Sequence, residues 1–441
     1  MKRLDYQDTT YNEAIEQLLT RGGTDEQLER EVAGILAEVR RRGDAAVAYY
    51  AGVFDHVALQ PRQFRVKTAD IRKASGQLKP AQRKAIRDAG RQVRDFSEQR
   101  IPQPWSYTPR KGVILGERFA PLNRVGVYVP GGTAPLVSSV IHTAGLAATA
   151  GVDEIVMVTP SAPDGSVHPG LLYAADQAGV TEIYRLGGVY AIGALAYGTD
   201  TVAKVEKIVG PGNAYVTEAK RQVYGHVALD LVAGPSEIMI IADDSADPVC
   251  VAADMLSQAE HGSGKEQVVL ATPSADLIDR VEAELIRQTE IRSRRDAIRR
   301  VLKNGAYLIH VETLEAAASL AGKYAPEHLE IHTVRPGMLA KKVDAAGAIF
   351  LGPFTPEPVG DFVAGPSHVL PTGGKARCFS GLTVEDFFRR MSVLNYQKTA
   401  LMNELPALRE IAAMEGLDGH GHSGAARRDL AVKPAAKPSN E

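Results

Sequence analysis

The 441-residue sequence is poor in cysteine and carries almost no net charge. Its two cysteines, Cys250 and Cys378, are too few for a disulfide framework or a thiolate zinc site, and they fit a reducing compartment. The formal net charge of -2 does not favour nucleic acid or an anionic membrane as a partner, since both attract basic surfaces. We therefore expect a cytoplasmic protein that binds neither.

Long apolar runs are missing as well. The N-terminal stretch MKRLDYQDTTYNEAIEQLL is polar after its two basic residues, which does not fit a secretory signal. No run approaches the roughly 18 apolar residues of a membrane span. With 44% hydrophobic and 24% charged residues, the composition is that of a globular protein, and the length favours more than one lobe.

Hydrophobic periodicity changes along the chain. Residues 1–105 are dominated by charged helical segments and are predicted to form a helical N-terminal region that packs on the second lobe. Residues 106–236 and 237–381 each alternate short β-branched runs with helical segments, as in a parallel sheet covered by helices on both faces. Residues 382–441 lack strand signals and are predicted to form an extended helical tail with a disordered end.

The predicted fold class is therefore α/β, with two Rossmann-like lobes built on incomplete doubly wound parallel sheets. Each predicted strand runs into a glycine, proline or polar turn. In the first lobe the strand segments are RVGVYVPGG, DEIVMVTP, EIYRLGG and EKIVGPGN, and in the second they are SEIMIIAD, EQVVLATP, AYLIHV, HLEIHT and GAIFLGP.

Ligands of open parallel sheets lie beyond the carboxyl ends of the strands, so the loops after the strands are the first place to search. Three of these loops, VPGGTAPLVSS, LGGVYAIGA and GPGNAYVTEAK, are glycine-rich, which lets backbone N–H groups approach a ligand. None contains G-x-G-x-x-G, and GSGKEQ at residues 262–267 is no P-loop because Glu266 replaces serine or threonine. Nucleotide binding and simple tight turns both remain open.

The stretch LSQAEHG places Gln258 and His261 three residues apart. On a helix both side chains would share a face and could reach one ion. Such a pair is more often the polar edge of an ordinary helix. Whether it is a metal site depends on ligands from elsewhere in the chain.

The stretch YAPEHLEIH places Glu327 beside His328, directly before a predicted strand. Histidine titrates near neutrality and suits proton abstraction from an alcohol, although Glu-His also commonly ends a strand. Pro326 restricts Ala325 to an extended conformation. Adjacent side chains diverge, so the two would border one cleft in separate roles.

Two further stretches contain isolated titratable residues. TPEPVGDFVAGPSHVLPTGG carries Asp361 and His368 among prolines and glycines, and charged residues in rigid irregular loops are often functional. EGLDGHGHS near the C-terminus carries Glu415 and His420, followed by His422. That last histidine pair could equally be a solvated tail.

Together these stretches resemble the histidinol dehydrogenases, which are zinc- and NAD-dependent enzymes of histidine biosynthesis. The resemblance implies oxidation of L-histidinol to L-histidine through histidinaldehyde, with two NAD consumed. It also implies a homodimer in which the C-terminal segment of one subunit completes the active site of the other. The matching stretches are RRGDAAVAYY, VGVYVPGGTAP, KIVGPGNAYVTEAKRQV, AGPSEIMIIAD, LSQAEHG, PEHLEI, GDF, HVLPT and EGLDGH.

The resemblance also assigns roles to residues. It implies a zinc site made of Gln258, His261, Asp361 and His420. It implies a catalytic pair, Glu327 and His328, and substrate contacts from Ser236, His368 and Glu415 together with His328 and the zinc ligands. Tyr128 and Asn213 match NAD contacts, whereas Tyr190 stands where the family often has an NAD-contacting glutamine.

In the implied mechanism His328 takes the hydroxyl proton, Glu327 activates the water that hydrates the aldehyde, and zinc mainly positions the substrate. A thiohemiacetal on Cys378 is an alternative for the aldehyde step, while Cys250 is interpreted as a core residue. Two other functions remain open: a related zinc- and NAD-dependent dehydrogenase of another polar alcohol, and a non-enzymatic metal-binding or assembly protein.

Overall fold

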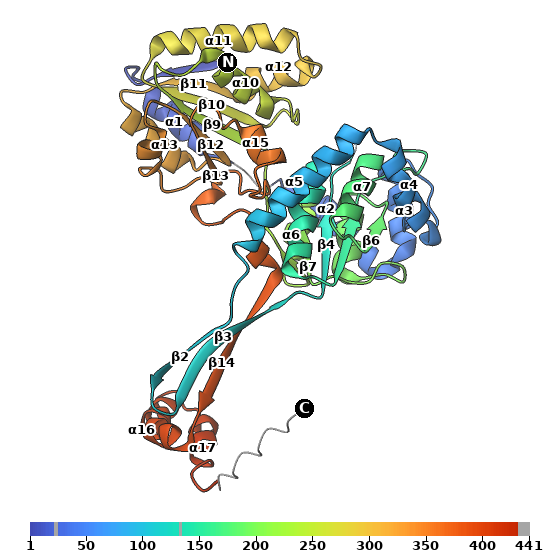
Figure 1. Ribbon diagram of the computed structural model, residues 1–441, viewed down its shortest axis with the longest axis vertical. Helices are drawn as coiled ribbons and strands as arrows, with labels where there is room; N and C mark the ends of the chain where they lie inside the picture. Colours follow the sequence, from blue (N-terminus) through green and yellow to red (C-terminus); the bar gives the residue numbers. More distant parts are fainter. Residues whose placement is uncertain (22–24, 132–134, 431–441) are drawn as a thin grey trace. The chain divides into compact units, whose positions relative to one another are not determined.

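The structure is a computed structural model that describes residues 1–21, 25–131 and 135–430. The chain divides into two compact units, Met1–Ile101 with Leu122–Phe387 and Pro102–Pro121 with Phe388–Glu441. The first unit contains two α/β lobes, and the second contains an antiparallel sheet and two helices (Figure 1). No helix in the described part of the chain is long and apolar enough to cross a membrane.

The first lobe contains a five-stranded parallel sheet in the order β6-β5-β4-β7-β8. The chain starts in the middle of the sheet, winds to one edge and returns to wind to the other, leaving a topological switch point between β4 and β7. The strands are β4 (Arg124–Tyr128), β5 (Glu154–Val158), β6 (Glu182–Tyr184), β7 (Lys207–Val209) and β8 (Ala228–Leu229). The helices are α6 (Val137–Ala150), α7 (Pro169–Gln177), α8 (Gly188–Tyr197) and α9 (Ala214–Val223).

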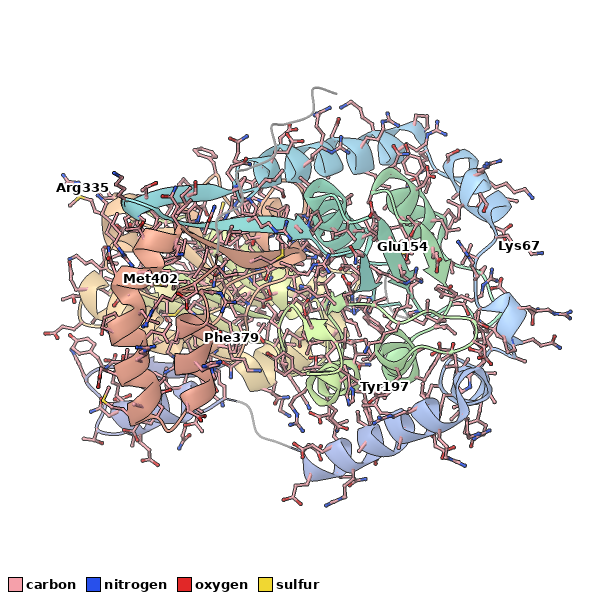
Figure 2. The ribbon with its side chains drawn as sticks, turned by 90° about the horizontal axis from the view of Figure 1, so that it is seen from below. Lys67, Glu154, Tyr197, Arg335, Phe379 and Met402 are labelled. Atoms are coloured by element: carbon pink, nitrogen blue, oxygen red, sulfur yellow. The ribbon has the colours of Figure 1, made fainter. Side chains whose placement is uncertain are left out.

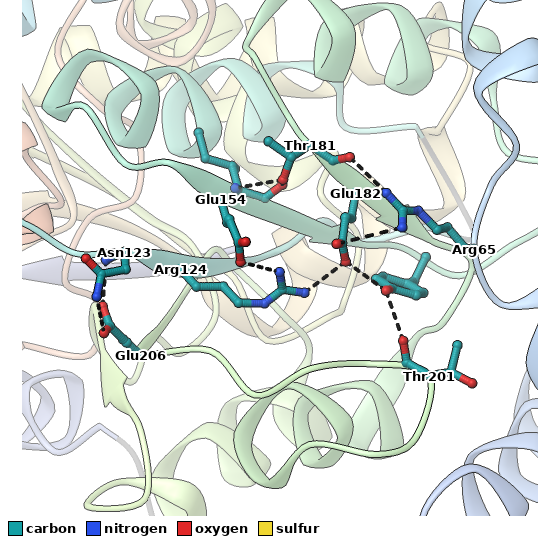
Figure 3. A network of polar contacts seen from close by, with 10 residues as sticks. Arg65, Asn123, Arg124, Glu154, Thr181, Glu182, Thr201 and Glu206 are labelled. Atoms are coloured by element: carbon teal, nitrogen blue, oxygen red, sulfur yellow. Dashed lines mark hydrogen bonds and ion pairs between the residues drawn. The ribbon is translucent and has the colours of Figure 1, made fainter.

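Ion pairs tie together the amino ends of β4, β5 and β6. The guanidinium of Arg124 lies between Glu154 at 2.6 Å and Glu182 at 2.8 Å, as Figure 3 shows. The Tyr184 hydroxyl also donates to Glu182, at 2.8 Å. Burial acts against ionisation of Glu182, but Arg124 and Tyr184 together lower the pKa of its carboxyl. The network fixes strand register at the edge opposite Tyr128, which ends β4.

The second lobe contains a six-stranded parallel sheet in the order β1-β11-β10-β9-β12-β13. Apart from the added β1, the winding repeats that of the first lobe, with the switch point between β9 and β12. The strands are β1 (Lys2–Asp5), β9 (Glu237–Ala242), β10 (Gln267–Thr272), β11 (Ala306–His310), β12 (His328–His332) and β13 (Ala348–Leu351). Every strand segment predicted for the two lobes is present, and the predicted α/β fold class is confirmed.

Helices cover both faces of the second sheet (Figure 1). Ile238 and Ile240 of β9 point to one helical layer, and Met239 and Ile241 point to the other, as strand alternation requires. The first layer is α10 (Pro248–Ala259), α11 (Ala275–Glu290) and α12 (Arg295–Gly305), and the second is α1 (Tyr11–Leu19), α13 (Leu314–Tyr324) and α14 (Pro336–Ala340). A short helix, α15 (Glu357–Phe362), follows β13. Charged residues such as Lys67 and Arg335 project outward (Figure 2).

The N-terminal region does not pack as one piece on the second lobe, which differs from the prediction. Of the described elements in this region, only β1 and α1 join that lobe. Val39 of α2 shares a hydrophobic core with Ala191 of the first lobe, and the absence of a side chain at Gly193 lets α2 approach α8. The helices of this region are α2 (Glu26–Arg42), α3 (Asp44–Phe54), α4 (Thr68–Ala74) and α5 (Pro80–Glu98), and all of them pack on helices of the first lobe.

The second unit corrects the prediction of a purely helical tail over residues 382–441. β14 (Phe388–Tyr396) pairs antiparallel with β3 (Val113–Pro121), which also pairs with β2 (Trp105–Arg110). Most of β14 is exposed, so its sequence lacks the apolar alternation of a half-buried strand. Helices α16 (Lys398–Met414) and α17 (Asp418–Ala425) follow, and the predicted disordered end falls on 431–441, outside the described residues. The 3₁₀ turns are Pro61–Gln63, Ser75–Gln77, Lys375–Arg377 and Val384–Phe387.

Candidate active site

The candidate catalytic pair lies at the switch point of the second lobe, at the amino edge of its sheet. His328 is the first residue of β12 and Glu327 precedes it, beside Glu237, the first residue of β9. In this lobe the candidate residues therefore lie at the edge opposite the one at which sequence reasoning looked for ligands. Helix α10 runs back to the amino edge, so its last turn carries Gln258 to the starts of the strands.

His328 is buried and held in one orientation. Its Nδ1 lies 3.1 Å from the Glu237 carbonyl oxygen, so Nδ1–H donates and the neutral ring carries its lone pair on Nε2. Nε2 lies 3.5 Å from Asp361 Oδ1 and 3.9 Å from Glu357 Oε1. Within the described chain Nε2 forms no hydrogen bond, and these two carboxyls are its ion-pair partners when the ring is charged.

Glu327 is anchored to the same strand. Its Oε2 accepts the backbone N–H of Glu237 at 2.9 Å and lies 3.8 Å from His328 Nδ1. Burial raises the pKa of Glu327 to about 8, against the opposing effects of His328 and of that hydrogen bond. This carboxyl can therefore gain or lose a proton near neutral pH, as a general acid or base must.

The other carboxyls control the charge on His328. Burial opposes a charged ring, but Glu327 and Asp361 outweigh it and raise the pKa of His328 to about 10. Burial likewise opposes the Asp361 anion, yet its contact with His328 holds the pKa of Asp361 well below its usual value. Burial and the charge of Asp361 raise the pKa of Glu357 to about 9. Without a bound cation these directions favour a charged His328 paired with Asp361 and a protonated Glu357.

The residues around Asp361 suit a divalent cation. Gln258 is fully buried, and neither its Oε1 nor its Nε2 has a partner within the described chain. His261 interacts electrostatically with Asp361 and His328, and desolvation lowers its pKa, which favours the neutral ring that binds metals. His328, Glu357 and Asp361 offer ligand atoms within 4.8 Å of one another. An orphaned amide, a neutral imidazole and carboxylates form a suitable N/O donor set for zinc.

His368 lies beside this donor set in a cavity of about 170 Å³ that His328, Asp361 and Phe350 also line. Its Nδ1 donates to the Asp361 carbonyl at 3.0 Å, and desolvation lowers its pKa. Its ring stacks on His142 of α6, with centroids 4.6 Å apart. Desolvation also lowers the pKa of His142, to about 3, so two neutral imidazoles lie face to face.

Comparison with known proteins shows the family of the chain. The family model for histidinol dehydrogenase matches residues 19–428. The chain belongs to the histidinol dehydrogenase family. It is 46% identical to histidinol dehydrogenase of Heliobacterium mobile, over 90% of this chain and 93% of that protein. For that of Geobacillus kaustophilus the identity is 45%, over 91% and 94%. The crystal structure of histidinol dehydrogenase from Elizabethkingia anophelis matches with a TM-score of 0.91 at 32% identity, covering 97% of this chain and 98% of that chain.

The residues that the family resemblance assigns to NAD lie in the first lobe. Tyr128 ends β4 and accepts the Gly188 N–H at 3.2 Å, and burial raises the pKa of its phenol to about 12. Asn213 caps α9 by accepting the Val216 N–H at 3.0 Å. Both lie beyond carboxyl ends of strands, at the switch point of a sheet of Rossmann type.

Tyr190 differs from the other residues assigned to NAD, because it is fully buried. Its hydroxyl accepts the Gly187 N–H at 3.1 Å and donates to Asp55. Both hydrogen-bonding directions of this hydroxyl are therefore used within the protein. Burial, followed by the charge of Asp55, raises the pKa of Tyr190 far above its usual range.

The remaining residues of the predicted histidinol dehydrogenase site come from other elements. Ser236 precedes β9, and its carbonyl accepts the Gln267 N–H at 3.2 Å. Glu415 ends α16 and His420 lies in α17, and both are exposed residues of the second unit. Their assigned roles, like those of the other site residues, remain predictions.

Two neighbours of the site were missed by sequence reasoning. Glu357 lies four residues before Asp361 on α15, and the i, i+4 spacing of two acids in TPEPVGDF could have identified it. His142 lies on a largely buried helix, and its sequence context carries no signal.

The two cysteines lie away from the cavity. Cys378 is exposed, its Sγ donates to the Lys375 carbonyl at 3.5 Å, and it is not among the described residues that line the cavity. Cys250 is half-buried on α10 rather than a full core residue, and burial raises the pKa of its thiol. The thiohemiacetal alternative receives no support from these positions.

The backbone conformation of Ala325 differs from the prediction. Instead of being extended, it has φ 48° and ψ 65° and closes α13 in the left-handed region. A non-glycine residue before proline is strained there, and such strain commonly lies beside functional residues. The turn leads directly into Pro326 and Glu327.

Proposed function

We propose that this chain oxidises L-histidinol to L-histidine through histidinaldehyde, using a bound zinc ion and two NAD. The observation that carries the proposal is the buried Glu327–His328 pair, with His328 Nε2 directed at Asp361. Family membership supports the choice of substrate. A cytoplasmic location remains part of the proposal.

In this proposal His328 is the base for both hydride transfers. The Glu237 carbonyl holds Nδ1–H, so only Nε2 can take the proton of the alcohol and later that of the aldehyde hydrate. A well-placed base contributes roughly 10² to 10⁴ in rate. The ring must be neutral to act, and a cation that engaged the Asp361 carboxylate would withdraw the charge that raises the pKa of His328.

Glu327 acts on the water of the middle step. Its Oε2 is held by the Glu237 N–H, and its pKa of about 8 lets it accept a proton from water as the aldehyde is hydrated. The hydrate then presents a second hydroxyl to His328. The two side chains are held by different groups of Glu237, the N–H for Glu327 and the carbonyl for His328, which is consistent with separate roles.

The zinc would be held by Gln258, His261 and Asp361 together with His420 of the partner subunit. When bound, it supplies a fixed positive charge and open coordination positions that orient the imidazole and amino groups of the substrate. His368, Ser236 and Glu415 would contact the substrate. Tyr128 and Asn213 would contact NAD, and Tyr190 would act by shaping the turn at the start of α8.

We further propose a homodimer with shared active sites, in which Glu415 and His420 complete the site of the partner subunit. Support comes from their exposure on α16 and α17, in a unit with few internal contacts compared with the first. The exposed apolar side chains of this unit include Trp105, Tyr107 and Leu394. Such surface is typical of protein interfaces.

One assay tests the proposed activity. Zinc-loaded protein is incubated with L-histidinol and NAD, and the NADH formed is counted per alcohol consumed. Two NADH are expected, with His328→Gln as the inactive control. One NADH would indicate a dehydrogenase of another polar alcohol that stops at the aldehyde, and none would reject the proposal in favour of metal binding without catalysis.

A further inference from the structure

Glu237 touches both members of the proposed catalytic pair through its backbone. Its N–H donates to Glu327 Oε2 at 2.9 Å, and its carbonyl accepts Nδ1–H of His328 at 3.1 Å. The first bond orients the carboxyl and the second selects the tautomer of the ring. Any shift of this one residue therefore moves both functional groups.

The side chain of Glu237 forms an ion pair with Arg21, a residue near the N-terminus. Its Oε1 lies 2.5 Å from Nη1 of Arg21, and the side chains are only 5% and 6% exposed. Burial raises the pKa of Glu237, with the charge of Arg21 opposing that rise. The ion pair joins the start of β9 to the residues that follow α1.

Arg21 is itself fixed by Tyr324. Its guanidinium lies 3.6 Å from the centre of the Tyr324 ring and also donates to the Tyr324 carbonyl. The Tyr324 hydroxyl donates to Gln267 Oε1 at 2.7 Å. Tyr324 directly precedes Ala325 and Pro326, which form the turn before β12. Arg21 therefore contacts both segments that lead into the catalytic pair: the start of β9 through Glu237, and the turn before β12 through Tyr324.

We propose that Arg21 and Glu237 are positioning residues that hold Glu327 and His328 in place through the first residue of β9. The inference rests on the proposed function of that pair. A buried ion pair is a poor source of stability, because desolvating two charges offsets most of their attraction. Its contacts instead serve geometry, since a misplacement of about 1 Å can reduce the rate on the order of a hundredfold.

The test compares Arg21→Met and Glu237→Gln with Arg124→Met in the zinc-loaded protein. Arg124 provides the matched control, because it forms an ion pair with Glu182 in the first lobe and does not contact the catalytic pair. The kcat and KM are measured well below the melting temperature of each variant, with histidinol and with histidinaldehyde as substrates. Zinc content is measured alongside.

For Arg21→Met and Glu237→Gln we expect kcat to fall by about ten- to a hundredfold with both substrates, with KM changed less than about threefold and zinc retained. Arg21→Lys, which keeps the charge, is expected to be intermediate. Arg124→Met is expected to lower the melting temperature while leaving kcat unchanged. Parallel loss on both substrates marks displacement of the pair, because loss of the Glu327 function alone would slow the aldehyde step selectively.

Retention of wild-type kcat by folded Glu237→Gln would overturn the positioning role, and so would a loss that Arg124→Met reproduces. Glu237→Gln nearly preserves side-chain shape, so it remains informative even if Arg21→Met does not fold. An inactive wild-type protein would instead reject the proposed function, which keeps the two failures distinguishable.

Discussion

Nε2 of His328 lies 3.5 Å from Oδ1 of Asp361, so the proposed base and a proposed zinc ligand face each other directly. The position that suits a metal therefore adjoins the position where the alcohol must lose its proton. One cluster therefore contains both the group proposed to hold the metal and the group proposed to take the proton.

Removing single donors is expected to release zinc. Gln258→Ala, His261→Asn and Asp361→Asn each remove one proposed ligand, which leaves the ion with fewer protein donors. We expect each purified variant to retain much less zinc than the wild type when measured by atomic emission. His310→Gln is the control, because His310 also lies in the second lobe but bonds Asp5 and Pro273. Full zinc in all three ligand variants would contradict the assigned site.

Substitutions of the two proposed catalytic residues are expected to slow different steps of the reaction. His328→Gln removes the base of both oxidations and should lower kcat by roughly 10² to 10⁴ with histidinol and with histidinaldehyde. Glu327→Gln should slow oxidation of the aldehyde much more than the first hydride transfer. Pre-steady-state NADH formation with each substrate measures this difference. Equal losses in both variants at both steps would argue against separate roles.

Shared active sites predict complementation between inactive subunits. His328→Ala disables one part of each site and His420→Ala another, so a hybrid dimer would contain one intact site. We expect activity to appear after subunits of the two variants are mixed and exchanged. Exchange is followed with differently tagged chains. No recovery above either parent after proven exchange would reject the shared site.

Tyr190→Phe is expected to destabilise the first lobe and weaken NAD binding. The change leaves the Gly187 N–H and the buried side of Asp55 without their partner, which costs roughly 1–3 kcal/mol. The turn before α8 then loosens, so KM for NAD should rise with little change in KM for histidinol. Tyr197→Phe, which removes a hydroxyl at the other end of α8, is the control. Unchanged melting temperature and KM for NAD would contradict this prediction.

A buried acidic cluster on β12 and α10 predicts a pH dependence of stability. His332 Nε2 lies 3.1 Å from Glu330 Oε2 and 3.8 Å from Asp254 Oδ2. Burial and then Glu330 raise the pKa of Asp254 to about 8. The folded protein therefore keeps this proton up to about pH 8, whereas the unfolded chain loses it above about pH 4.

The contribution of Asp254 to the free energy of unfolding therefore falls as the pH rises from about 4 to about 8. We expect Asp254→Asn to become progressively more stable relative to the wild type between about pH 5 and pH 8, as measured by denaturant unfolding. The exposed Asp153→Asn variant should show no such trend. A difference between Asp254→Asn and wild type that is constant with pH would show that Asp254 is ionised in the fold.

The sequence predicts the strands of both lobes except β1 and β8, because each of the predicted strands is a compact apolar run that ends at a turn. β1 (Lys2–Asp5) is mostly charged and β8 (Ala228–Leu229) has only two residues, so neither carries this signal. β14 escapes prediction since its exposed faces carry arginines and polar residues, and its stability comes from pairing with β3 rather than from burial. The packing of α2 on α8 depends on the shape match at Gly193, which periodicity does not encode.

For the candidate site, the sequence supplies the residue types but not their neighbours. Gln258, His261, Glu327, His328 and Asp361 stand in recognisable stretches of the chain. The link through Glu237 is made by main-chain atoms, and any residue at that position carries the same N–H and carbonyl groups. Side-chain identity therefore gives no signal for it, and only the pairing of β9 with β12 brings it to the catalytic pair.

The stacking of His142 on His368 joins helix α6 of the first lobe to a residue that lines the cavity of the second lobe. The setting of the His368 ring therefore depends on side chains from both lobes. A substitution at His142 would alter this setting without changing any residue of the cavity lining itself.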